Sequence, residues 1–153
     1  TRGNGTVGEN ITKNALTINS LPKVLTEHTS LEVRGEVYLS RARFDELNDE
    51  LEKAGKPLMA NSRNAAAGTL RQLDSNVVKE RGLSIFVFNI QKSEKKFETH
   101  SESIAYAKSI GITTIAYSKV AVGIEQVLEY ITEIGKLREK NNWKKIKKML
   151  KSA

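Results

Sequence analysis

The segment NSRNAAAGTLRQLD, residues 61–74, sets two arginines on either side of a run of three alanines and a glycine. Guanidinium groups such as those of Arg63 and Arg71 bind phosphate oxygens through paired hydrogen bonds. The small residues between them allow a ligand to approach the backbone closely. In one helix the two arginines would lie about 12 Å apart along the axis, which matches about two phosphate steps of a nucleic-acid strand. The alternative is a small-residue helix packed under a sheet, with its arginines extending to solvent.

A second candidate lies in LEVRGEVYL, residues 31–39, where apolar and polar residues alternate. The two-residue period of a strand predicts an apolar face and a polar face, formed by Leu31, Val33, Val37 and Leu39 and by Glu32, Arg34, Glu36 and Tyr38. Polar side chains on one face repeat at about 6.6 Å. Two interpretations stand. The polar face is solvated and its charges compensate one another, or a carboxylate binds a sugar hydroxyl or a metal while the arginine binds a phosphate.

The remaining patterns predict the elements that position these residues. Ser40 is a suitable cap for a helix that ends near Gly55, and LSIFVFNI, residues 83–90, has the β-branched and aromatic content of a buried strand. Further predicted elements are a tight turn between short strands in residues 1–10, helices at 61–73, 101–110 and 124 to about 137, and a strand at 113–122. Strands and helices that interleave without a regular rhythm favour an α+β fold, with antiparallel sheets flanked by helices.

The letters GNGTVG at residues 3–8 fit the G-x-G-x-x-G pattern of dinucleotide-binding folds. That pattern must follow a strand and open a helix, whereas here two residues precede it and a β-rich stretch follows. A hairpin turn that carries Arg2, with or without a ligand, is the better interpretation.

Composition limits the class of protein. The 153 residues are 39% hydrophobic and 28% charged, as in one globular domain. The absence of cysteine excludes thiolate zinc sites, and His28 and His100 lie far apart in polar surroundings, so we expect no metal site. No apolar run is long enough to cross a membrane and no signal pattern opens the sequence, which makes a cytoplasmic location the expectation.

The net charge of +7 is concentrated at one end of the chain. Residues 137–153 hold seven Lys or Arg and one Glu, and the other residues are nearly neutral. Trp143, Ile146 and Leu150 fall on one stripe of a lysine-rich helix. Such a segment either is solvated or binds an acidic surface.

Taken together, TRGNGTVGENIT, LEVRGEVYL, NSRNAAAGTLRQLD and IFVFNI resemble, in this order, the adenylation domain of bacterial NAD-dependent DNA ligases. The resemblance runs to about residue 138. It indicates one partial adenylation domain over residues 1–153, with a basic tail, 139–153, outside the resemblance.

The resemblance implies a nucleotidyltransferase fold and a three-step reaction. A lysine takes AMP from NAD, the AMP passes to the 5′-phosphate of a nick in double-stranded DNA, and the 3′-hydroxyl displaces it, with Mg²⁺ as cofactor. Carried onto this chain, Arg2 contacts the phosphate of AMP or of the nick. Glu36 accepts hydrogen bonds from the adenosine ribose, Phe88 stacks on adenine, and Arg63 and Arg71 bind phosphates at the nick.

Departures from the family pattern are equally informative. The 153 residues contain neither the K-x-D-G motif that carries the nucleophilic lysine nor a DGVVIK strand after residue 138. Asn4, Ser62 and Phe88 stand where the family has Asp, Pro and Tyr. We therefore expect a catalytically inactive chain, either an expressed fragment or the product of a truncated or frame-shifted gene.

Two alternatives remain beside that expectation. One is a non-catalytic nucleic-acid-binding module that uses the basic tail, and the other is a degenerate remnant. Because strands of the parent fold would be missing, exposed sheet edges are expected to favour self-association.

Overall fold

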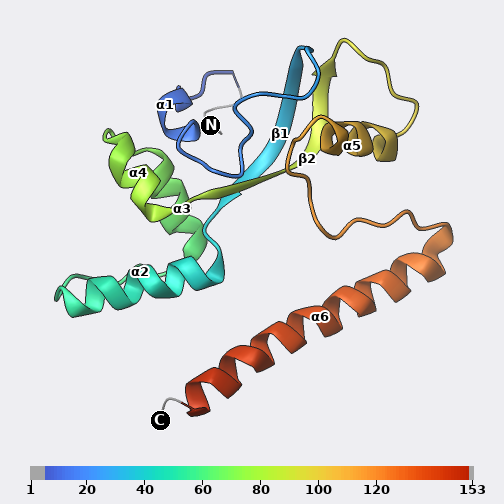
Figure 1. Ribbon diagram of the computed structural model, residues 1–153. Coiled ribbons are helices and arrows are strands. Elements are labelled where there is room, and N and C mark those ends of the chain that lie inside the picture. The colour runs from blue at the N-terminus through green and yellow to red at the C-terminus, as the bar shows by residue number, and fades with distance from the viewer. Residues whose placement is uncertain (1–5, 152–153) are drawn as a thin grey trace. The chain divides into compact units, whose positions relative to one another are not determined.

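A computed structural model describes residues 6–151 of the chain and the side chains of residues 6–140. The chain divides into two compact units, Thr1–Ile115 and Ala116–Ala153. The first unit holds a two-stranded sheet with the helices α1 to α5 (Figure 1), and the second holds the long helix α6, Gly123–Lys151. Among the residues described, no helix is both long and apolar enough to cross a membrane.

Strands β1 (Leu31–Tyr38) and β2 (Ser84–Ser93) pair in antiparallel fashion and form the centre of the first unit. Their register shifts twice, between Glu32 and Val33 and between Arg34 and Gly35. Arg34 pairs with Asn89 and Gly35 with Val87, so Phe88 is the extra residue of a β-bulge. Bulges increase twist locally and change the direction of the side chains that they carry.

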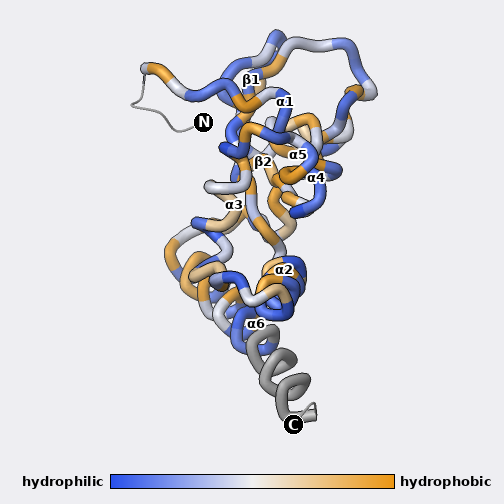
Figure 2. The backbone as a smooth tube through the Cα atoms, turned by 90° about the vertical axis from the view of Figure 1, so that its left-hand side faces the viewer, coloured by the Kyte–Doolittle hydropathy of each residue, from blue (hydrophilic) through white to orange (hydrophobic). Residues whose placement is uncertain are grey.

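Five helices surround this sheet: α1 (Thr12–Ala15), α2 (Arg41–Lys53), α3 (Ser62–Leu70), α4 (Ser75–Arg81) and α5 (His100–Ser109). Four of them begin at a side-chain oxygen that accepts a backbone N–H of the first turn, contributed by Ser40, Asn61, Asp74 and Thr99. Such caps satisfy donors that the helix itself leaves free. Orange and blue positions alternate around the turns of α2 in Figure 2, as expected of a helix with one buried side.

Two clusters of buried side chains stabilise the first unit, and strand β2 runs past both. The first cluster lies under α2, α3 and α4 and consists of Ile18, Leu39, Leu47, Ala66, Val78 and Leu83. The second joins β2 to α5 and consists of Val87, Tyr106, Ala107, Ile110 and Ile112. The sheet is thereby fixed along its length, which holds its polar face in place.

Several sequence predictions are confirmed. The class is α+β, the strands at 31–39 and 83–90 form and pair, and a helix follows Ser40. The helix predicted at 101–110 forms one residue earlier, as His100–Ser109. The helix predicted from residue 124 continues to Lys151. Helix α4 was not predicted, because residues 75–81 are too few to show a helical period.

Other predictions are wrong. Residues 113–122 form no strand. Thr114 makes one isolated parallel bridge with Val87, and the chain beyond it finds no further strand to pair with. Residues 6–10 likewise form no strand. The described residues thus hold one two-stranded sheet rather than several. Val33 is 37% exposed instead of buried, because the bulges break the alternation predicted for β1.

Gly35 sits where the backbone of β2 leaves no room for a side chain on β1. A Cβ atom at this position would lie 2.5 Å from the carbonyl oxygen of Phe86, closer than the two atoms can approach. Glycine inside a strand marks such an approach of one backbone to another. The pairing of β1 with β2 beside Phe86 therefore depends on the missing side chain.

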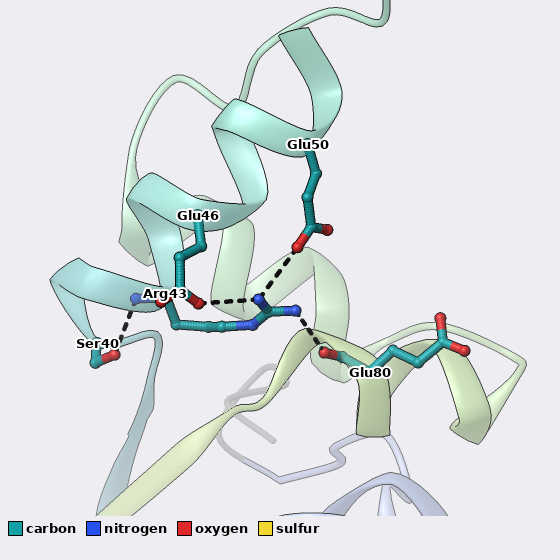
Figure 3. A network of polar contacts seen from close by, with 5 residues as sticks. All are labelled: Ser40, Arg43, Glu46, Glu50 and Glu80. Atoms are coloured by element: carbon teal, nitrogen blue, oxygen red, sulfur yellow. Dashed lines mark hydrogen bonds and ion pairs between the residues drawn. The ribbon is translucent and has the colours of Figure 1, made fainter. Parts of the chain in front are cut away.

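Arg43 joins α2 to the end of α4 through one guanidinium group (Figure 3). Its Nη2 donates to the carbonyl oxygen of Glu80 at 2.9 Å, and its Nη1 lies 3.1 Å from Glu46 and 3.3 Å from Glu50. The arginine side chain is 28% exposed, whereas both carboxylates are 62% exposed. Only the bond to the Glu80 carbonyl links α2 to α4, because Glu46 and Glu50 both belong to α2 itself.

Replacing Gly35 by alanine should lower the free energy of unfolding by about 1–3 kcal/mol, because the two strands must move apart to admit the methyl group. Gly68 provides the matched control. Nothing lies within 4 Å of a Cβ at that helical position, so Gly68→Ala should raise stability by about 0.5–1 kcal/mol. Urea denaturation followed by circular dichroism measures both changes. Equal effects of the same sign would contradict the close approach at Gly35.

Replacing Arg43 by methionine keeps the aliphatic stem and removes every donor. We expect a loss of about 1–2 kcal/mol, since the carbonyl of Glu80 loses its partner. Glu46→Gln disrupts an exposed ion pair alone and should cost less than about 1 kcal/mol. Thermal unfolding of the two variants compares them directly, and a larger loss in Glu46→Gln would show that the surface pair matters more than the backbone contact.

Candidate nucleotide and nucleic-acid site

Three of the predicted site residues line one hollow of about 540 Å³ in the first unit. Glu36 comes from β1, Arg63 from α3 and Phe88 from β2. The other residues of its wall are Val37, Tyr38, Leu39, Ser62 and Phe86. Segments that are far apart in the sequence therefore bring a carboxylate, a guanidinium group and aromatic rings to the same place.

Local geometry places the aromatic rings. Phe86 is the partner of Glu36 across the sheet, and its ring lies 5.6 Å from that of Tyr38, measured between centroids. Phe88, the bulged residue, is half-buried and lines the same hollow. The hollow consequently has an apolar, aromatic wall beside the exposed carboxylate of Glu36.

Arg63 lies in the first turn of α3, one residue after Ser62. The turn is fixed by Asn61, whose Oδ1 accepts the backbone N–H of Asn64 at 2.8 Å. The guanidinium group itself is exposed. Farther along the same helix Ala66 and Thr69 are buried while Ala67 and Gly68 are exposed, so α3 presents to solvent a surface without bulky side chains.

Arg71 does not share this hollow, and it is not part of the helix. It is the residue that caps α3, so the predicted relation of two arginines along one helix is wrong. The helix ends there because the chain turns back, with the N–H of Gln72 donating to the carbonyl of Thr69. Arg71 lines a second hollow of about 700 Å³, formed by residues 9–14 and 70–73. Its Nε lies 3.1 Å from a carboxylate oxygen of Glu9.

Asn14 holds the turn that carries Arg71, a role that the sequence analysis missed. Its buried Nδ2 donates to the carbonyl of Leu70 at 2.9 Å and to that of Gln72 at 2.7 Å. One amide thus ties residues 70–72 to α1, on either side of Arg71. Nothing in a single sequence marks Asn14 for this role, because its partners are backbone atoms 56 and 58 residues away.

The sheet carries one further ion pair, whose residues do not line either hollow. Arg2 lies outside the described residues. Glu32 and Lys92 face each other across the sheet with 2.9 Å between their charged atoms. The hydrogen bond and the attraction of Glu32 raise the pKa of Lys92. Within the described part of the chain, no group of three histidine or acidic side chains gathers into a metal site.

Comparison with known proteins agrees with this arrangement. The chain belongs to the family of NAD-dependent DNA ligase adenylation domains, whose family model matches residues 1–146. It is 50% identical over 141 residues to a DNA ligase of Thermoanaerobacter sp. (strain X514), an alignment that covers 92% of this chain and 21% of that protein.

Two further relatives give the same result. A DNA ligase of Acetivibrio thermocellus is 49% identical over 140 residues, covering 90% of this chain and 21% of that protein. A DNA ligase of Clostridioides difficile is 44% identical over 132 residues, covering 86% and 20%. The chain thus spans about a fifth of the length of the curated relatives that it matches.

Replacing Asn14 by aspartate should destabilise the first unit by about 2–3 kcal/mol, because two backbone carbonyls lose their donor and face a negative charge instead. The same substitution at Asn19, which is exposed, should change stability by less than about 0.5 kcal/mol. Chemical denaturation measures both. A small effect at Asn14 would show that the turn at Arg71 holds its conformation without this amide.

Proposed function

We propose that this chain is the part of an NAD-dependent DNA ligase adenylation domain, with the nucleotidyltransferase fold, that contacts adenylate and nicked DNA. The observation that carries the proposal is the common hollow of Glu36, Arg63 and Phe88. Its volume lies within the range of about 300–1,000 Å³ that small-ligand sites occupy. The family to which the chain belongs supports the choice of ligand.

Each side chain suits one part of adenylate. The phenyl ring of Phe88 offers a face on which adenine stacks, although it lacks the hydroxyl group of the tyrosine usual in the family. An ionised carboxylate only accepts hydrogen bonds, and that of Glu36 accepts them from the ribose hydroxyls. The guanidinium group of Arg63 binds phosphate oxygens in pairs. Adenine, ribose and phosphate would thereby be held by residues of β2, β1 and α3.

Arg71 is proposed to bind a phosphate of the DNA at the nick. Its ion pair with Glu9 is exposed on both sides, 59% and 60%, and pairs of this kind contribute about 0–1 kcal/mol. A phosphate group can therefore displace the carboxylate at little cost. The surface of Ala67 and Gly68 lets the sugar-phosphate backbone approach α3 between the two arginines. Arg2 is proposed to contact the phosphate of AMP or of the nick.

The reaction of the whole ligase begins when a lysine nitrogen attacks the α-phosphorus of NAD. The bond from phosphorus to the bridging oxygen breaks, and nicotinamide mononucleotide leaves. AMP then passes to the 5′-phosphate of the nick. The 3′-hydroxyl attacks that phosphate and releases AMP, which seals the strand as DNA replication and repair in the cytoplasm require. NAD is the substrate, and Mg²⁺ would enter with the phosphates, which supply much of its usual coordination. Residues 1–153 without the K-x-D-G lysine are proposed to lack the covalent step.

A second candidate function rests on the charge of the C-terminal segment. Residues 137–153 hold seven Lys or Arg and one Glu, and such a segment binds nucleic acid through its phosphates with a steep dependence on salt. The chain would then be a non-catalytic binding module or a remnant. Removing residues 138–153 should abolish DNA binding in this case. If Arg63 and Arg71 carry the binding, it should survive.

The nucleotide site is tested by titrating the 153-residue chain with AMP and following chemical shifts by NMR. Glu36→Gln should weaken binding about tenfold or more, because it removes a charged acceptor, and Phe88→Ala should weaken it by a similar factor. Glu32→Gln is the matched control, since Glu32 lies on the same strand outside the hollow. Equal losses in Glu32→Gln and Glu36→Gln would contradict the assignment of the hollow.

Incubation with NAD labelled in its adenylate part tests the covalent step. We expect no labelled protein from the 153-residue chain, whereas a full-length ligase of the family labels as a positive control. A stable AMP adduct on this chain would show that another side chain acts as the nucleophile.

A further inference from the structure

The hollow of Glu36, Arg63 and Phe88 contains one more polar group, the hydroxyl of Tyr38. Tyr38 lines the hollow and is 38% exposed. Within the part of the chain that the structure describes, its hydroxyl has no hydrogen-bond partner. The ring lies beside that of Phe86, with 5.6 Å between centroids and 55° between planes. This contact limits the movement of the ring and leaves a donor available to a ligand.

The register of the two strands sets the order of the residues along the hollow. Glu36 pairs with Phe86 and Tyr38 with Ser84, and no bulge separates these pairs. The side chains of Glu36 and Tyr38 therefore share one face of β1, about 6.6 Å apart along the strand. Phe88, the bulged residue, lies on the other side of Glu36 from Tyr38. Along the sheet the order is thus an aromatic ring, a carboxylate and a hydroxyl.

Arg63 enters the hollow at the end that Tyr38 occupies. Helix α3 packs against the end of β1 that leads into α2 (Figure 1), where Ala66 and Leu39 belong to the same buried cluster. Arg63 lies three residues before Ala66, and residues at this spacing are neighbours on the surface of a helix. Within the described residues its guanidinium group has no ion-pair partner. Arg63 and Tyr38 therefore offer unpaired donors to the same part of the hollow.

We propose that Tyr38 is a further ligand-binding residue, and that its hydroxyl donates a hydrogen bond to the 5′-phosphate of adenylate beside Arg63. This inference rests on the proposed nucleotide site. In AMP the ribose joins the base to the 5′-phosphate. A ligand with adenine on Phe88 and ribose on Glu36 consequently brings its phosphate to Tyr38. A hydroxyl that donates to an anionic oxygen forms a stronger bond than one between neutral groups.

The reverse orientation of the ligand fits the hollow less well. It would set the phosphate beside Phe88, whose ring has no hydrogen-bond donor. Among the described residues that line the hollow, Arg63 is the one cation. The charge of the phosphate and the hydroxyl of Tyr38 therefore favour the same orientation.

Titration of the 153-residue chain with AMP and with adenosine, followed by NMR, tests the proposal, because the two ligands differ only in the 5′-phosphate. Tyr38→Phe keeps the ring and removes one hydrogen bond to a charged group. It should weaken AMP binding about tenfold and adenosine binding less than about twofold. Glu36→Gln should weaken both, since both ligands carry the ribose. Adenosine 3′-monophosphate, which lacks the 5′-phosphate, should respond to Tyr38→Phe as adenosine does.

Tyr106→Phe is the matched control. The hydroxyl of Tyr106 is buried without a hydrogen-bond partner, but Tyr106 belongs to the cluster beside α5 and does not line the hollow. Its removal should leave both affinities unchanged. Circular dichroism verifies that both tyrosine variants are folded.

The outcomes separate this inference from the proposal on which it rests. A Tyr38→Phe variant that binds AMP as tightly as the unmodified chain would overturn the role of Tyr38 and leave the nucleotide site standing. Equal losses for AMP and adenosine would do the same, because the hydroxyl would then act on the nucleoside. If the unmodified chain binds neither ligand, the nucleotide site fails and the role of Tyr38 fails with it.

Discussion

The antiparallel contact between β1 and β2 at Gly35 is the constraint on which the first unit depends. The carbonyl of Phe86 approaches so closely that no side chain fits at that position. Immediately beyond it the register shifts, and Phe88 becomes the extra residue of a bulge. The same pairing places Glu36 opposite Phe86. Removing this contact would disperse the aromatic wall of the hollow and separate it from the carboxylate.

Much of this arrangement follows from local patterns. The alternation of residues 31–39, the β-rich run after Leu83 and the cap at Ser40 predict their elements because each depends on neighbours in the chain. Glu36, Arg63 and Phe88 could be selected as a group because they lie in motifs that resemble one family. What the sequence did not predict depends on distant partners. Three features could be predicted only by knowing which segments meet in the fold. They are the bulges that expose Val33, the missing strand at 113–122, and the hydrogen bonds from Asn14 to the turn at Arg71.

Arg71 illustrates the difference most clearly. A helical period from residue 61 to residue 73 predicts that it continues the line begun by Arg63. The helix instead ends at Leu70, and Arg71 meets Glu9, more than sixty residues earlier in the chain. Periodicity indicates where a helix is favourable, but the residue at which the helix ends depends on the hydrogen-bond partners available to the backbone that follows. Here that partner is the amide of Asn14, and the two arginines consequently serve separate hollows.

Strand β2 has one further property that concerns the first unit as a whole. Ile85 packs against one buried cluster and Val87 belongs to the other, only two residues along the strand. The backbone of Val87 is also bound on its second edge, where its N–H donates to Thr113 and its carbonyl accepts from Ile115. A ligand that presses on the rings of this strand therefore meets the resistance of both clusters together. The rigidity of the strand therefore depends on both clusters. A change that weakens the packing of α5 would make the hollow of Glu36, Arg63 and Phe88 more mobile, although α5 contributes no residue to its wall.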